Sequence, residues 1–167
     1  ALITHIDDQV GRLLNALETQ NLINNTIVVF MSDHGELLGD HGYTEKCLMY
    51  EASVRVPCLL CWPGNLPAGL RVTTPFAGVD LMPTLLALVD GTPPAPIDGR
   101  SVAEAILNER EPEAQPIFAE IASLDAIYRG AEEPEQLAAH VMNYDGRWKY
   151  ILNRFDIDEL YDLKTDP

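Results

Sequence analysis

One segment of the sequence is short, almost wholly apolar and rich in β-branched residues: Thr26-Ile27-Val28-Val29-Phe30-Met31. This composition is typical of a strand that is covered on both faces of a sheet. Before it, residues 2–17 repeat apolar positions at helical spacing, which predicts an amphipathic helix with one buried face. A helix followed by a buried strand favours an α/β fold, in which a layered and mostly parallel sheet is flanked by helices.

Two later segments extend this pattern. Residues Pro57–Trp62 predict a second buried strand that ends in a Pro-Gly turn. Asp80 can cap a helix that runs to Leu88. Together these elements predict an α/β core over residues 1–115.

The C-terminal part has a different pattern. Residues 140–144 and 147–152 flank the dipeptide Asp145-Gly146, which is the strongest signal for a two-residue β-hairpin. We therefore expect a small antiparallel hairpin unit, within a C-terminal subdomain over residues 116–167.

Composition excludes several partners. The chain has 26 acidic and 11 basic residues, and its net charge of −15 repels nucleic acid and anionic membranes. No run is long and apolar enough to predict a transmembrane helix. The three cysteines, Cys47, Cys58 and Cys61, are too few and odd in number for a disulfide framework. Because Cys58 and Cys61 lie in a predicted buried strand, we expect them to be core thiols.

A polar, glycine-rich segment follows the first predicted strand: Ser32-Asp33-His34-Gly35-Glu36-Leu37-Leu38-Gly39-Asp40-His41-Gly42. Open α/β sheets place their sites beyond the carboxyl ends of strands. Neighbouring residues within a strand point to opposite faces, so Asp33 and His34 can share an ion only where the strand ends. Their position allows this, and the glycines let the backbone turn tightly.

The longer pattern is more specific. The run S-D-H-G-E-L-L-G-D-H-G-Y-T-E-K, followed by Y-E-A-S-V-R-V-P, resembles the sulfatase family of the alkaline phosphatase superfamily. The resemblance extends to N-T-I-V-V-F before it, and to W-P-G, D-L-M-P-T-L-L, E-L-Y-D-L and D-P after it. These pieces follow the order of the family and span nearly the whole chain. They imply an alkaline-phosphatase-like fold, of which the chain carries a part.

The resemblance assigns roles by position. Asp33 and His34 correspond to two ligands of the single active-site metal. Lys46 corresponds to the lysine that holds the sulfate oxygens, with a catalytic role in offsetting charge that develops on them. An ammonium group suits this task, since it offers three donors to a tetrahedral anion.

Other residues of the segment have less definite roles. His41 has three alternatives: it lines the substrate pocket, it acts as a catalytic donor of a proton to the leaving oxygen, or it braces the loop through Asp40. Tyr43 is expected to border the substrate pocket. Glu51 and Arg55 are four residues apart, which predicts a structural ion pair.

Two apparent motifs fail. The nucleophile motif of the family is C-x-P-x-R or S-x-P-x-R, whose Cys or Ser is oxidised to formylglycine. The segment Cys61-Trp62-Pro63-Gly64-Asn65 has asparagine in place of the arginine and lies downstream of the metal ligands, so Cys61 is not the nucleophile. Asp156-Ile157-Asp158 begins like a calcium loop, but Tyr161 stands where that loop requires glycine.

The resemblance implies a sulfuric ester hydrolase with a divalent metal, calcium in preference to manganese, and a formylglycine nucleophile. The nucleophile and the first acidic ligands belong to a missing N-terminal part, so we expect a chain truncated at both ends and inactive alone. The expected substrate is a small-molecule or saccharide sulfate ester. Two alternatives remain open: a phosphonate monoester or phosphodiester hydrolase of the same superfamily, and a non-catalytic relative that binds anions.

Two further expectations concern the chain in solution. A chain that is part of a larger core exposes apolar surface, which predicts self-association. No signal-peptide pattern is present, and a cytoplasmic location is the working expectation.

Overall fold

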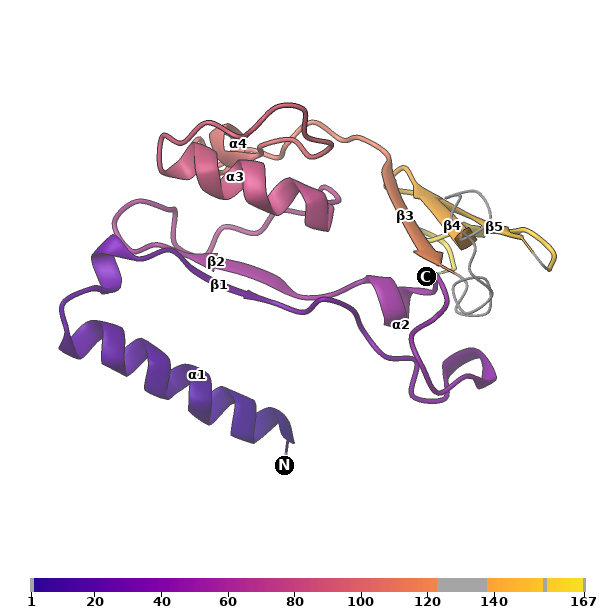
Figure 1. The fold of residues 1–167 in the computed structure, drawn as a ribbon, viewed down its shortest axis with the longest axis horizontal. Helices are drawn as coiled ribbons and strands as arrows, with labels where there is room; N and C mark the ends of the chain where they lie inside the picture. The colour runs from indigo at the N-terminus through magenta and orange to yellow at the C-terminus, as the bar shows by residue number, and fades with distance from the viewer. Residues whose placement is uncertain (1, 123–137, 155, 167) are drawn as a thin grey trace.

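The computed structural model describes residues 2–122, 138–154 and 156–166. Figure 1 shows a ribbon of two strands, β1 (Val28–Met31) and β2 (Cys58–Cys61), with helix α1 (Leu2–Thr19) on one side. Helices α3 (Leu81–Leu88) and α4 (Ala103–Leu107) lie on the other side. This arrangement confirms the predicted layers of helices around strands. The short helices are η1 (Ile23–Asn25), η2 (Asp40–Gly42), α2 (Glu51–Val54) and η3 (Gly78–Asp80).

The direction of β2 corrects the expectation of a mostly parallel sheet. β1 and β2 pair antiparallel, with Val28 opposite Cys61 and Met31 opposite Cys58. The chain leaves the end of β1, forms the loop that carries α2, and re-enters at the same end. A parallel pair would require a crossover connection back to the opposite end. All strand pairs among the described residues are antiparallel.

The strands of this ribbon are less buried than their composition predicted. Phe30 is 41% exposed and Leu59 is 58% exposed. Cys58 and Cys61 are also exposed, so the prediction of core thiols is wrong for this chain. Helix α1 likewise has no buried residue. Apolar composition shows which residues suit burial, but burial also requires a second surface to pack against.

The C-terminal hairpin is confirmed and belongs to a larger sheet. Strands β3 (Ile117–Ala122), β4 (Ala138–Tyr144), β5 (Trp148–Asn153) and β6 (Glu159–Asp162) are neighbours in that order. The turn between β4 and β5 contains Gly146 at φ 95°. The carboxylate of Asp145 accepts hydrogen bonds from the amides of Arg147 and Trp148. The domain boundary between residues 115 and 116 stays a prediction.

A small core joins this sheet to the segment around α2. Met49, Met142 and Ile151 are buried together, and partly buried residues including Tyr50 and Val54 pack against them. Burial alternates strictly along β5, where every second residue faces this core. The C-terminal sheet therefore packs against the segment that follows the candidate site.

Helices α3 and α4 are joined through polar contacts. The hydroxyl of Thr84, which is fully buried, accepts a hydrogen bond from the amide of Val102 at 3.1 Å. The carboxylate of Asp80 accepts hydrogen bonds from the amides of Ala77 and Arg100. Among the described residues, no helix has the length and apolar character needed to cross a membrane.

Candidate active site

Asp33 and His34 lie together directly after β1, as the sequence predicted. The His34 amide donates a hydrogen bond to Asp33 Oδ1 at 3.0 Å, and His34 Nε2 lies 3.6 Å from Asp33 Oδ2. His34 Nδ1 is 2.8 Å from the carbonyl oxygen of Gly35. A carbonyl oxygen only accepts, so this contact requires the proton on Nδ1. In the neutral ring, the lone pair then lies on Nε2, which is 3.6 Å from Asp33 Oδ2.

This tautomer is the one that a metal ligand needs. Ligating histidines donate their second ring N–H to a carbonyl or carboxylate, which orients the ring and keeps the ligating nitrogen free. The side chain of Asp33 is 87% exposed and that of His34 is 40% exposed, so both can reach an ion. A carboxylate oxygen and an imidazole nitrogen therefore fit two positions of a divalent metal site.

Two side chains alone do not complete a metal site. In the parts of the chain that the structure describes, no group of three or more His, Cys, Asp or Glu side chains could hold a metal. A metal bound by Asp33 and His34 would therefore need further ligands from outside the described residues.

The backbone after the pair is held by α2. The amide of Gly35 donates to the carbonyl of Ser53 at 2.7 Å, and the amide of Glu36 donates to the carbonyl of Ala52 at 3.0 Å. A Cβ atom on Gly35 would lie 1.9 Å from the carbonyl oxygen of Ala52, so no other residue fits here. This close approach holds the backbone directly after Asp33 and His34 against α2.

Lys46 is held by the same element. The hydroxyl of Ser53, which is buried, donates a hydrogen bond of 2.5 Å to the carbonyl oxygen of Lys46. The amide of Leu37 bonds to the carbonyl of Glu45 at 3.2 Å. The side chain of Lys46 is exposed. Helix α2 is thus bonded to the two residues that follow the predicted metal ligands and to the backbone of the predicted anion lysine.

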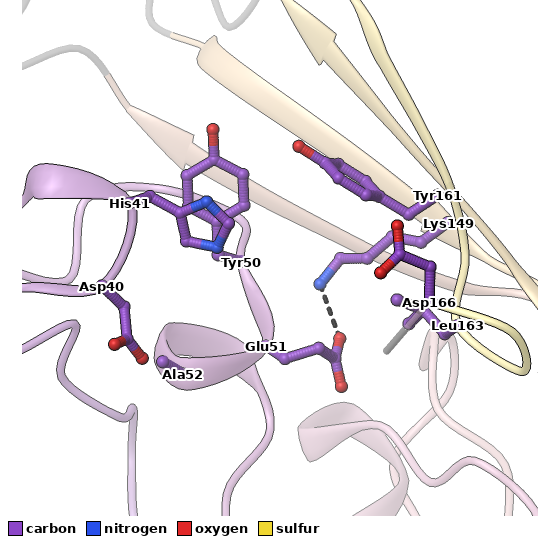
Figure 2. Close-up of a pocket in the computed structure, with 9 residues that line it drawn as sticks. All are labelled: Asp40, His41, Tyr50, Glu51, Ala52, Lys149, Tyr161, Leu163 and Asp166. Atoms are coloured by element: carbon purple, nitrogen blue, oxygen red, sulfur yellow. Dashed lines mark hydrogen bonds and ion pairs between the residues drawn. The ribbon is translucent and has the colours of Figure 1, made fainter.

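His41 lies apart from Asp33, His34 and Lys46. Its ring stacks on Tyr50, with ring centroids 3.8 Å apart and planes inclined by 14°. Both residues line a pocket of about 320 Å³ between the η2 loop, α2 and the C-terminal sheet, with Lys149 and Tyr161 on the opposite side (Figure 2). Tyr43 is 55% exposed and is not among the lining residues of this pocket. The structure brings His41 to Tyr50, and its predicted roles stay predictions.

Sequence reasoning missed an ion pair between Glu51 and Lys149. Lys149 is 1% exposed, and its Nζ lies 2.7 Å from Glu51 Oε1. Burial lowers the pKa of Lys149, and the hydrogen bond that Lys149 donates to Glu51 opposes that shift. The predicted Glu51–Arg55 ion pair is wrong, because among the described residues the cation beside Glu51 is Lys149. The sequence signal that could have revealed a buried Lys149 was the alternation along β5, which places Lys149 on the same face as Ile151.

A second polar group lies beside this pair. Glu159 accepts hydrogen bonds from the hydroxyls of Tyr50 and Tyr161 and from the side-chain amide of Asn153. Burial acts to raise the pKa of Glu159, but these hydrogen bonds outweigh it and lower that pKa below its ordinary value. Burial and Glu159 together raise the pKa of Tyr161. Glu159 therefore stays an anion that holds both tyrosines.

Comparison with known proteins identifies the family of this chain. A family profile described as Sulfatase matches residues 1–92. The N-acetylglucosamine-6-O-sulfatase of Bacteroides thetaiotaomicron is 32% identical over 167 residues, which is 100% of this chain and 30% of that protein. One similar solved structure is of a protein in complex with its own substrate, D-glucosamine-2-N,6-O-disulfate. Its TM-score is 0.83 and its sequence identity is 31%, and the match covers 99% of this chain and 33% of that protein's chain. The solved structure of the phosphonate monoester hydrolase of Silicibacter pomeroyi has a TM-score of 0.79 and a sequence identity of 29%. The match covers 96% of this chain and 33% of that one.

The layered fold and the Asp-His pair at the end of β1 define an α/β protein of the alkaline phosphatase superfamily. Within that superfamily, the chain belongs to the sulfatase family. It spans 30% of the length of the curated relative and 33% of each of the two solved structures named above.

Proposed function

We propose that the protein carrying this chain hydrolyses sulfate esters of small molecules or saccharides. The observation that carries the proposal is the Asp33–His34 pair, whose free Nε2 lies beside a carboxylate and whose loop is bonded to the same helix as Lys46. The comparisons support it, since a relative is named N-acetylglucosamine-6-O-sulfatase and a similar structure was solved with a disulfated glucosamine as its substrate.

Each residue of the site has a defined task in this proposal. Asp33 and His34 hold a divalent metal, for which calcium is the first choice and manganese the second, because calcium prefers oxygen ligands and imidazole suits manganese. The metal supplies positive charge that polarises the sulfate. Lys46 donates hydrogen bonds to the sulfate oxygens and stabilises charge that develops on them. The nucleophile, a formylglycine, and the other ligands come from outside these 167 residues.

A second candidate function is hydrolysis of phosphonate monoesters. It is favoured by one observation, the similarity to the phosphonate monoester hydrolase of Silicibacter pomeroyi. Both reactions need a metal and a cation that grips a tetrahedral anion. Asp33, His34 and Lys46 therefore serve either of them, and the substrate must be determined by assay.

The test compares the full-length protein with its Asp33→Ala and Lys46→Ala variants on an aryl sulfate and on an aryl phosphonate monoester. We expect turnover of the sulfate in preference to the phosphonate. Loss of Asp33 should weaken binding of calcium measured by calorimetry. Loss of Lys46 should lower kcat/KM about 100-fold or more, as removal of one group that stabilises the transition state does, and leave metal affinity unchanged.

Lys164 provides a matched control for Lys46, since it is exposed and lies beyond β6, outside the candidate site. Its change to alanine should leave kcat/KM unchanged. Preferred turnover of the phosphonate would replace the proposed reaction with the second candidate. A wild-type protein without activity on either ester, but with bound calcium, would favour the non-catalytic alternative.

A further inference from the structure

Helix α2 is joined to the C-terminal sheet at its first turn. Glu51 Oε1 accepts a hydrogen bond from Lys149 of β5 at 2.7 Å. Tyr50, directly before the helix, donates its hydroxyl to Glu159 of β6 at 3.0 Å. Figure 2 shows Lys149 reaching from the sheet towards Glu51 at the edge of the pocket. The two contacts connect segments about a hundred residues apart in the sequence.

Lys149 occupies a position where an apolar residue would be expected. It lies on the core-facing side of β5, on the same face as the buried residue Ile151. A buried charge is tolerated only when it is paired, and a buried ion pair is often no more stabilising than apolar residues of similar volume. Stability alone therefore does not account for a lysine at this position. The lysine is explained by its directional contact, which fixes the position of Glu51.

The opposite side of α2 contacts the candidate site. The carbonyls of Ala52 and Ser53 accept the amides of Glu36 and Gly35, directly after the metal-ligand pair. The hydroxyl of Ser53 is bonded to the carbonyl of Lys46. A shift of this four-residue helix therefore moves the metal-ligand loop and the lysine loop.

We propose that Lys149 is a positioning residue for the active site. Through Glu51 it holds α2, and α2 sets the place of Asp33 and His34 relative to Lys46. The proposal rests on the proposed function for its effect on turnover. Its structural part, the coupling between Lys149 and the Gly35–Glu36 backbone, is independent of which ester is hydrolysed.

The test uses Lys149→Met in the full-length protein. Methionine retains length and apolar packing but removes the charge and the hydrogen bond. We expect kcat to fall about 10-fold and the Kd for calcium to rise by a similar factor, the lower end of what loss of a supporting contact does to a metal site. KM should change by less than kcat. Hydrogen exchange at the amides of Gly35 and Glu36 should become faster.

Arg147→Met is the matched control. Arg147 lies in the turn before β5 and pairs with Asp162 at 2.7 Å, and among the described residues its side-chain hydrogen bonds go to Asp162 and not to α2. Its loss removes an ion pair at the surface of the same subdomain and should leave kcat, calcium affinity and exchange at Gly35 unchanged. Equal effects of the two variants on kcat would overturn the proposal. An unchanged rate of hydrogen exchange at the Gly35 amide in Lys149→Met would also overturn it.

A second variant covers the case in which Lys149→Met does not fold. Glu51→Gln removes the carboxylate charge of the pair, and its amide oxygen can still accept a hydrogen bond from the buried Lys149 ammonium. If Lys149 acts through Glu51, the double variant should be no worse than the more impaired single variant, whereas independent sites add their effects. Additive losses would overturn the proposal. If the wild-type protein turns over no ester, the proposed function fails, and the exchange and calcium measurements still decide the positioning role.

Discussion

At the scale of single residues, Gly35 is the position where the site is least tolerant of change. A Cβ there would meet the carbonyl oxygen of Ala52 at 1.9 Å, and backbone cannot move aside as a flexible side chain can. We expect Gly35→Ala to destabilise the protein by about 1–3 kcal/mol, the usual range for overpacking, and to lower turnover because α2 is displaced. Urea unfolding and kcat measure the two effects.

Gly11 supplies the control for this substitution. It lies inside α1, where an added Cβ meets nothing within 4 Å. Gly11→Ala should therefore stabilise the protein by roughly 0.5–1 kcal/mol, because glycine is unfavourable within a helix. The same chemical change should have opposite signs at the two sites. A Gly35→Ala variant as stable as the wild type would contradict the close approach of the loop to α2.

Single residues also show how far sequence reasoning reaches. Asp33 and His34 are adjacent in the chain and follow a strand, so their proximity could be predicted from local pattern. Glu51 and Lys149 are far apart in the chain, and no local rule joins them. The predicted partner of Glu51 was Arg55, four residues away, because helical spacing was the only geometry available. The position of Lys149 depends on how a whole sheet packs.

At the scale of elements, Glu111 ties together two segments that lack regular structure. Its carboxylate accepts hydrogen bonds from the amides of Thr73 and Thr74 at 2.9 Å each, and from both hydroxyls at 2.8 Å. The two backbone amides come first among the causes that hold the pKa of Glu111 at about 2, below its ordinary value of 4.5. Because folding favours the ionised form, the contribution to stability is present above pH 4.5 and is lost as the pH falls towards 2.

We therefore expect Glu111→Gln to lower the thermal unfolding midpoint at neutral pH, by an amount that shrinks as the pH falls from 4.5 towards 2. Glu113→Gln, at an exposed position two residues further on, removes the same charge and should have little effect. Thermal unfolding followed by circular dichroism over this pH range measures both. A pH-independent difference between Glu111→Gln and the wild type would contradict the assigned hydrogen bonds.

Elements differ in how well local pattern defines them. The hairpin at Asp145-Gly146 was predictable because its turn type requires those residues. The direction of β2 was not, because composition does not encode where a returning chain pairs. The four-stranded sheet likewise depends on β3 and β6 joining the hairpin from distant segments.

At the scale of the whole molecule, the apolar residues of α1 and of the β1–β2 ribbon lack cover within the described parts of the chain. Ile3 is 84% exposed, Ile6 is 52% exposed and Leu13 is 55% exposed, although helical spacing places such residues on a buried face. Leu59 on β2 is exposed as well. Patches of this kind on a soluble protein mark surfaces that associate.

We expect these 167 residues, prepared alone, to self-associate through this surface. The net charge of −15 opposes association, and salt screens that repulsion, so the associated fraction should rise with salt concentration. Sedimentation velocity over a range of concentrations measures it. Changing Ile6 and Leu13 together to lysine should shift the chain towards monomer. Changing Ile157 to lysine, at an 81% exposed position after β5, should not. If the double variant and the control associated equally, the α1 surface would have no part in the association. If added salt dissociated the assemblies, charge rather than apolar contact would hold the copies together.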